Sequence, residues 1–205
     1  GATTQLTFNF TGLCPGIYYI EIRDGSGSAP YTSTIILTEP PALTAGTTSN
    51  NVSCNGACDG NINLNVGGGT PPYGYAWTGP GGPYSTEDLT GLCAGTYDVT
   101  VTDGNGCTIT ASVTITEPPA LTSSVAETDI LCNGTCTGAA DLTVAGGTPP
   151  YGFVWVGSGG PYSTEDLSGL CAGTYDVTVT DANGCTSTAS VTINEPPALT
   201  ASATS

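Results

Sequence analysis

Residues 92–119, LCAGTYDVTVTDGNGCTITASVTITEPP, decide the fold because two alternating stretches flank a turn. Tyr97, Val99 and Val101 alternate with polar residues, which is the pattern of a strand with one buried face. The Asp-Gly-Asn-Gly sequence at 103–106 predicts a tight turn, because Asn-Gly accepts positive φ. A second alternating stretch over 109–115 predicts the returning strand. We therefore expect an antiparallel hairpin here.

Further strands are predicted upstream of this hairpin. Apolar residues alternate with asparagine over 62–66, and the Gly-Gly-Gly-Thr-Pro-Pro sequence at 67–72 ends that stretch. Aromatic residues then alternate over 73–77, ending on Trp77, where an immunoglobulin-like domain places a core tryptophan. Tyr97 follows Gly95 by two residues, which indicates a tyrosine corner whose hydroxyl bonds to nearby backbone. Short strands separated by turn signals favour an immunoglobulin-like antiparallel β-sandwich.

The chain repeats this unit with a step of 78 residues. Residues 1–41 are the second half of a repeat, 42–119 and 120–197 are full repeats, and 198–205 are the first strand of a following repeat or a donor strand. A short Thr-Glu-Pro-Pro linker separates the repeats, and its prolines restrict it to extended conformations. The predicted fold is therefore all-β: tandem immunoglobulin-like sandwiches in an end-to-end rod.

Composition excludes several classes of function. The net charge is −16, with Arg23 as the one basic residue, so the chain would repel nucleic acid and an anionic membrane surface. There is no stretch of about 20 apolar residues that could insert into a membrane. The chain has neither His nor Lys, which removes the commonest general base and lysine nucleophiles. We expect no enzymatic activity and no obligatory cofactor.

Nine cysteines without any histidine favour disulfides, and hence an oxidising extracellular compartment. Each full repeat holds four cysteines, and Cys14 matches one of those positions in the partial repeat. The partial repeat keeps the Cys93 position but lacks the Cys107 position, so these two are not expected to pair. Cys54 precedes the first alternating strand and Cys107 begins the last one. The predicted disulfides are Cys54–Cys107, Cys58–Cys93, Cys132–Cys185 and Cys136–Cys171.

Cys14 has no predicted partner within the chain. Its partner would occupy the position equivalent to Cys58, in an earlier segment of a longer chain or in a neighbouring subunit. A free reactive thiol is the alternative.

Two kinds of surface site remain open. The adjacent carboxylates Glu87-Asp88 and Glu165-Asp166 are loop charges or weak Ca²⁺ ligands, and neighbouring residues on a strand make a poor acid–base pair. Asn9, Asn51 and Asn133 each begin an N-x-S/T sequence and are candidate glycosylation sites.

Several short motifs, taken in order, resemble the SprB-type repeat of long surface adhesins in Bacteroidetes. They are Cys-Asn-Gly (54–56, 132–134), Gly-Gly-Thr-Pro-Pro-Tyr (68–73, 146–151), Ala-Gly-Thr-Tyr-Asp-Val-Thr-Val-Thr-Asp (94–103, 172–181), Asn-Gly-Cys-Thr (105–108, 183–186) and Thr-Glu-Pro-Pro (116–119). The resemblance implies export to the bacterial cell surface, through the type IX system, and a role in adhesion or surface motility. It also implies that the Cys-Asn-Gly and Asn-Gly-Cys cysteines pair, which agrees with Cys54–Cys107.

We consider two functions. The first is a structural segment of an extracellular adhesin or fibre, whose partners are flanking repeats or copies of the chain joined head to tail. Strand complementation would then bring Ala198, Leu199 and Ala201 against Leu6, Phe8 and Phe10. The second is a module that binds glycans or proteins through Tyr84 and Tyr162, although such loop aromatics can equally plug the end of a sandwich.

Overall fold

The computed structural model describes residues 10–202 except 24, 26 and 28, and this part of the chain forms strands and no helix. Every strand pairing in it is antiparallel. The prediction of an all-β antiparallel fold is therefore confirmed.

Each full repeat folds as two small sheets packed face to face. In the first sandwich, β3 (Thr44–Asn50), β4 (Gly60–Gly67) and β6 (Leu89–Leu92) form one sheet in the order β3-β4-β6. The other sheet has the order β5-β7-β8, from β5 (Gly74–Thr78), β7 (Gly95–Thr102) and β8 (Thr108–Ile115). This division of strands is that of an immunoglobulin-like sandwich.

The second sandwich repeats the same topology. Its sheets have the orders β9-β10-β12 and β11-β13-β14. The strands are β9 (Thr122–Thr128), β10 (Gly138–Ala145), β11 (Gly152–Val156), β12 (Leu167–Leu170), β13 (Gly173–Thr180) and β14 (Thr186–Ile193).

The core lies between the two sheets of each sandwich. Trp77 is 1% exposed and Tyr97 is completely buried. The Tyr97 hydroxyl donates a hydrogen bond to the Cys93 carbonyl (2.9 Å), and Tyr175 makes the same bond to Cys171 (3.0 Å). The core tryptophan and the tyrosine corner are therefore confirmed.

Ahead of the first sandwich, β1 (Gly16–Ile22) and β2 (Tyr31–Leu37) form an antiparallel hairpin. It corresponds to β7 and β8, and it keeps the tyrosine corner through a bond from the Tyr18 hydroxyl to the Cys14 carbonyl (2.6 Å). Among the described residues, the two strands form a separate sheet without a third strand. No described strand therefore lies over its apolar face as β3, β4 and β6 lie over β7 and β8.

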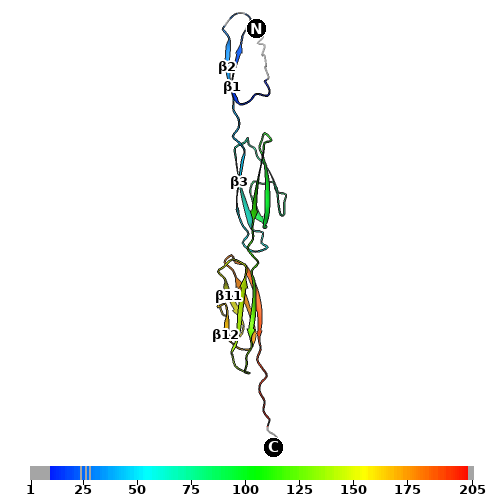
Figure 1. Cartoon of the computed structure of the whole chain (residues 1–205), viewed down its shortest axis with the longest axis vertical. Helices are drawn as coiled ribbons and strands as arrows, with labels where there is room; N and C mark the ends of the chain where they lie inside the picture. The colour runs from blue at the N-terminus through cyan, green and yellow to red at the C-terminus, as the bar shows by residue number, and fades with distance from the viewer. Residues whose placement is uncertain (1–9, 24, 26, 28, 203–205) are drawn as a thin grey trace.

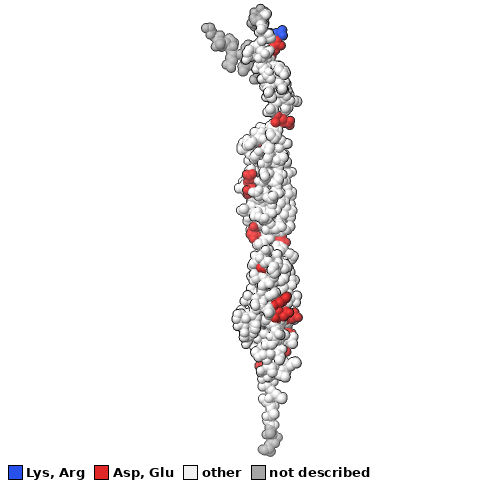
Figure 2. All heavy atoms as spheres, turned by 90° about the vertical axis from the view of Figure 1, so that its left-hand side faces the viewer, with Lys and Arg blue, Asp and Glu red and all other residues white. Residues whose placement is uncertain are grey.

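Figure 1 shows the hairpin, the first sandwich and the second sandwich following one another along the longest axis of the molecule. Acidic residues are scattered along the surface in Figure 2, and the basic residue, Arg23, lies at the hairpin end. Arg23 forms an ion pair with Glu21. No helix in the described residues is long and apolar enough to cross a membrane.

Candidate functional site: the junction between the sandwiches

The two sandwiches meet through opposite ends. The loop that contains Cys54 and Cys58 joins β3 to β4 and lies at one end of the first sandwich, where β4 begins. The turn that contains Cys107 joins β7 to β8 and lies at the other end, because Thr70 and Asp103 are hydrogen-bonded there. In the second sandwich the equivalent turn, with Cys185, faces the Cys54 loop.

A disulfide joins Cys54 of the first sandwich to Cys185 of the second, with a Cα–Cα distance of 5.8 Å. The predicted pairs Cys54–Cys107 and Cys132–Cys185 are therefore wrong. The sequence argument placed Cys54 and Cys107 together because each precedes a strand. Antiparallel strands start at opposite ends of a sandwich, however, and an eight-residue strand spans about 26 Å at roughly 3.3 Å per residue. One disulfide cannot bridge that distance.

The other two disulfides lie within one sandwich each. They join Cys58 to Cys93 and Cys136 to Cys171, which are the pairs that the sequence predicts. Both tie the loop before the second strand of a repeat to the tyrosine corner. Among the described residues, Cys14, Cys107 and Cys132 are exposed free thiols.

The proline linker is held by backbone and side-chain contacts from the first sandwich. Asn55 Nδ2 donates a hydrogen bond to the Pro118 carbonyl (3.1 Å), and the Gly56 N–H donates to a Glu117 carboxylate oxygen (2.7 Å). The Val52 N–H also donates to the Thr116 carbonyl (3.1 Å). The linker is thus anchored to the same loop that contains Cys54.

The second sandwich holds the other end of the linker. The Gly147 N–H donates to the Pro119 carbonyl (2.8 Å), and Leu121 packs against the second core. A Cβ atom at Gly146 would lie 1.9 Å from the Ala120 carbonyl oxygen, so only glycine permits this approach. The prolines reduce the conformations of the linker, and these contacts position it between the two sandwiches.

Asn183 makes a hydrogen bond directly across the junction between the sandwiches. Asn183 Nδ2 donates to the Ser53 carbonyl (2.9 Å) and to the Thr148 hydroxyl (3.1 Å). Asn183 precedes Cys185 by two residues, so the asparagine and the cysteine of the same turn both bind the first sandwich. Sequence reasoning assigned Asn183 only to the turn, although its position in a repeated Asn-Gly-Cys motif was visible.

Buried aspartates shape the two turns that carry Cys107 and Cys185. Asp181 is 5% exposed, and its carboxylate accepts hydrogen bonds from the N–H groups of Thr148 (2.8 Å), Asn183 (2.9 Å) and Cys185 (2.9 Å). Burial raises the pKa of Asp181, but these N–H donors outweigh burial, and the pKa falls below its usual value. Asp103 has the same surroundings and also a lowered pKa. Both aspartates therefore form Asx turns, because each carboxylate accepts a hydrogen bond from the N–H group two residues further on.

The acidic pairs have structural contacts. The Asp88 carboxylate accepts a hydrogen bond from the Leu64 N–H (2.9 Å), and Asp166 accepts one from the Leu142 N–H (2.9 Å). Burial and the nearby Glu87 carboxylate both raise the pKa of Tyr75. No group of three or more acidic, cysteine or histidine residues that could hold a metal ion occurs in the described part of the chain. Glu165 remains an exposed loop residue.

The loop tyrosines are part of the sandwich ends. The Tyr84 hydroxyl donates to the Pro80 carbonyl (2.6 Å), and the Tyr162 hydroxyl donates to the Ser158 carbonyl (2.8 Å). Both rings are half-buried and pack against the core clusters. Because their hydroxyls and part of their ring surface are in use, they offer a poor platform for stacking a sugar.

Two candidate glycosylation sites lie in linker contacts. The Asn51 side-chain oxygen accepts a hydrogen bond from the Thr116 N–H (2.9 Å), and Asn133 Nδ2 donates to the Pro196 carbonyl (2.9 Å). Nδ2 is the atom that an N-linked glycan would modify, so a glycan on Asn133 would compete with its linker contact. Asn9 lies outside the described residues.

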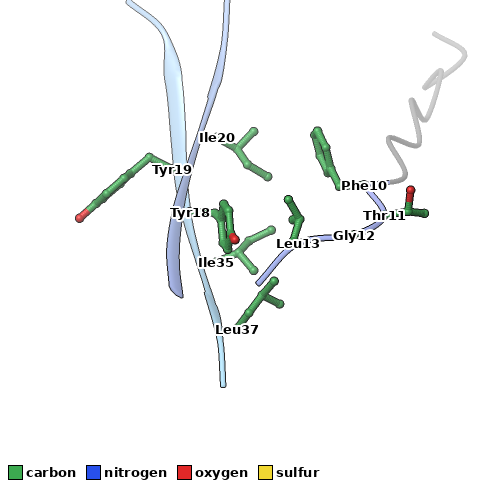
Figure 3. Close-up of a pocket in the computed structure, with 9 residues that line it drawn as sticks. All are labelled: Phe10, Thr11, Gly12, Leu13, Tyr18, Tyr19, Ile20, Ile35 and Leu37. Carbon is green, nitrogen blue, oxygen red and sulfur yellow. The ribbon is translucent and has the colours of Figure 1, made fainter. Parts of the chain in front are cut away.

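The hairpin carries an apolar groove (Figure 3). Phe10 and Leu13 line one side of the groove, and Tyr18, Ile20 and Ile35 line the other, while Tyr19 points away from it. Phe10 is 62% exposed. Of the predicted assembly residues, Ala198, Leu199 and Ala201 are exposed, Leu199 completely so, whereas Leu6 and Phe8 lie outside the described residues.

Comparison with known proteins finds a family model that matches part of each sandwich. A family model described as the SprB repeat matches residues 46–82 and 124–160, which are separated by the same 78-residue step. Each matched stretch contains the first two cysteines of a repeat and its core tryptophan. No curated protein matches the chain.

Solved structures of immunoglobulin domains are similar to the chain at low identity. The structure titled "Structural basis for Dscam isoform specificity" has a TM-score of 0.33 and 12% identity, and the match covers 80% of this chain and 50% of that one. The four N-terminal domains of Dscam1 isoform 9.44 give 0.34 and 14%, with the same coverage. Murine CEACAM1b gives 0.29 and 14%, over 65% of this chain and 92% of that one. This chain spans about half the length of the two Dscam structures. The family resemblance indicated by the sequence motifs is confirmed by two SprB repeat matches, one in each sandwich.

Proposed function

We propose that this chain is a structural, load-bearing segment of an extracellular bacterial surface adhesin or fibre, and that it has no catalytic role. The observation that carries the proposal is the Cys54–Cys185 disulfide, which joins neighbouring sandwiches covalently. A linker anchored at both ends and a cross-link between domains both suit a stalk that transmits force. The SprB repeat matches and the disulfides support an extracellular, cell-surface location.

The partners that we propose are flanking repeats of the same type, joined head to tail. The groove of the β1–β2 hairpin supports this view, because its residues Tyr18 and Ile20 correspond to Tyr97 and Val99 of β7, which are buried in the first sandwich. Covering those residues takes a whole sheet, β3-β4-β6. A segment equivalent to residues 198–202 would supply only one strand of it. We therefore favour flanking repeats over strand complementation between copies of the chain.

Single-molecule force spectroscopy tests the load-bearing role. When the native chain is pulled from its ends, force passes through the Cys54–Cys185 disulfide, which shields a span of 131 residues. Subtracting the two 35-residue loops closed by the other disulfides leaves 61 residues. Cys54→Ser should therefore release about 61 more residues, or about 210 Å at roughly 3.5 Å each.

Cys107→Ser is the matched control, because it removes a free thiol from the equivalent turn of the first sandwich. It should leave the force–extension trace unchanged. A Cys54→Ser trace that matches the native trace would contradict the proposed covalent force path.

A further inference from the structure

The repeated sequence places two free thiols where the junction places a disulfide. Cys107 occupies the position of Cys185 in its repeat, and Cys132 occupies the position of Cys54. The structure leaves Cys107 and Cys132 exposed, whereas Cys54 and Cys185 are bonded to each other. Each free thiol therefore lies at one end of its sandwich, and the equivalent cysteine of the other sandwich forms the disulfide of the junction.

The surroundings of Cys132 are built as they are around Cys54. Asn133 Nδ2 donates to the Pro196 carbonyl (2.9 Å), and the Gly134 N–H donates to a Glu195 oxygen (2.8 Å). These bonds repeat those of Asn55 and Gly56 at the occupied junction. The linker beyond the second sandwich is thus already held in the conformation that leads into a following sandwich.

Two exposed leucines lie near Cys132, at the end of the second sandwich from which the linker leaves. Leu131, which precedes Cys132, is 88% exposed. Leu199 is fully exposed, although Leu121, its equivalent one repeat earlier, packs against the core of the second sandwich. An incoming sandwich would cover Leu199 as the second sandwich covers Leu121, and this burial of apolar surface would favour docking.

The surroundings of Cys107 are built as they are around Cys185. Asp103 accepts hydrogen bonds from the N–H groups of Asn105 (3.0 Å) and Cys107 (2.8 Å), as Asp181 does in the second sandwich. The Gly69 N–H holds the incoming linker through the Pro41 carbonyl (2.7 Å). Asn105 Nδ2 donates to the Thr70 hydroxyl (2.9 Å) and is placed, like Asn183, to reach a second acceptor on a preceding sandwich.

We propose that Cys107 and Cys132 are the two complementary halves of the same inter-repeat disulfide, each completed by an adjacent sandwich of this repeat type. Cys132 bonds the cysteine equivalent to Cys185 in the following sandwich, and Cys107 bonds the cysteine equivalent to Cys54 in the preceding one. Every junction between complete sandwiches would then be covalently closed. This inference rests on the serial arrangement in the proposed function.

Formation of the bond is a two-electron oxidation that consumes a small-molecule or protein disulfide. One thiolate attacks the oxidant disulfide and forms a mixed disulfide, releasing the first thiol of the oxidant. The thiolate of the neighbouring sandwich then attacks the mixed disulfide and releases the second thiol. The two cysteine thiols lose two electrons and two protons, and the oxidant gains them.

The test uses the full chain and a lengthened chain, each refolded with oxidised and reduced glutathione. The lengthened chain adds a further copy of residues 120–205 directly after residue 197. In the added copy, Ser190→Ala changes the mass of the peptide that contains the Cys185 equivalent, so that this peptide can be told apart from the original one. Cys132→Ser in the added copy removes the new terminal thiol. Peptide mapping without reduction should show Cys54–Cys185 and a free Cys132 thiol in the full chain. In the lengthened chain, Cys132 should instead bond the Cys185 equivalent of the added copy.

Each outcome separates the inference from the proposed function. A Cys132–Cys107 bond between two copies of the full chain would support the inference that these two cysteines are complementary halves of one inter-repeat disulfide. A Cys132 thiol that stays free in the lengthened chain, while Cys54–Cys185 forms, would overturn the inference and leave the proposed force path intact. Bonds within one repeat, Cys54–Cys107 and Cys132–Cys185, would overturn both.

Discussion

At the scale of single residues, the sandwich ends depend on a few polar groups that satisfy backbone donors. Asp103 and Asp181 are buried acidic residues, and backbone N–H groups of their own turns bind their carboxylates. Buried carboxylates require such partners, because an unpaired charge in the interior is costly. These two residues therefore set the geometry of the turns that present Cys107 and Cys185.

Stability is expected to fall in acid through these aspartates. Their pKa values lie below the ordinary 3.8 in the folded chain, because N–H donors stabilise the charged form despite burial. The unfolded chain therefore binds protons at a higher pH. The stabilisation is complete above about pH 3.8 and is lost as the pH falls below 3.8 through the folded pKa. Urea denaturation between pH 5 and about pH 2 measures this loss.

Asp103→Asn should lower stability at neutral pH and reduce its dependence on pH below 3.8. Asp98→Asn makes the same charge change on an exposed strand position and is the matched control. Equal pH dependence in Asp103→Asn and the native chain would contradict this role.

At the scale of elements, the linker is positioned by close backbone approach at glycines. Gly146 and Gly184 both have positive φ, at 73° and 85°. A Cβ atom at Gly146 would strike the Ala120 carbonyl of the linker, whereas a Cβ atom at Gly184 would meet nothing within 4 Å. Alanine substitutions at these two glycines therefore distinguish the cost of backbone strain from the cost of a clash with the linker.

Gly146→Ala should destabilise the second sandwich and its junction more than Gly184→Ala does. Both variants place alanine at positive φ, which costs roughly 1–2 kcal/mol. Gly146→Ala adds overpacking against the linker, which costs about 1–3 kcal/mol more. Thermal unfolding followed by calorimetry measures the difference. Equal melting temperatures for the two variants would show that the linker does not lie against Gly146.

At the scale of the whole molecule, the sandwiches and the hairpin differ in how completely they are covered. The sandwiches enclose a core between two sheets, whereas in the described part of the chain the hairpin has one sheet and an apolar groove lined by Phe10 and Leu13 (Figures 1 and 3). A two-stranded hairpin alone is marginally stable in water. The hairpin should therefore open far more readily than the sandwiches.

Amide hydrogen exchange should be roughly 100-fold faster in β1 and β2 than at the equivalent positions of β7 and β8. Tyr18 with Tyr97, and Ile20 with Val99, are matched pairs of amides. Equal protection in dilute native chain would contradict an uncovered hairpin.

The same measurement separates flanking repeats from strand complementation between copies. If copies of the chain complement one another, amide exchange in the hairpin should become slower at high protein concentration. Leu199→Asp should then restore the fast exchange, and Thr200→Asp should not. That result would contradict our choice of flanking repeats. Both variants add one negative charge at adjacent exposed positions. A difference in exchange between them therefore measures the contribution of the Leu199 side chain.

Local patterns in the sequence were sufficient to predict β4, β5, β7 and β8 with their repeats, the tyrosine corner, the core tryptophan and the 78-residue step, whereas the short strands β6 and β12 were not predicted. Burial alternates along β4, β5 and β7, and a turn is determined by neighbouring residues, so short stretches of sequence are enough to indicate these features. The partners of Cys54 and Cys185 were not predictable in this way. The spacing of cysteines within a repeat does not show which end of a sandwich each one occupies. Tertiary structure decided the pairing, because antiparallel strands place Cys54 and Cys107 at opposite ends and the linker brings Cys185 to Cys54.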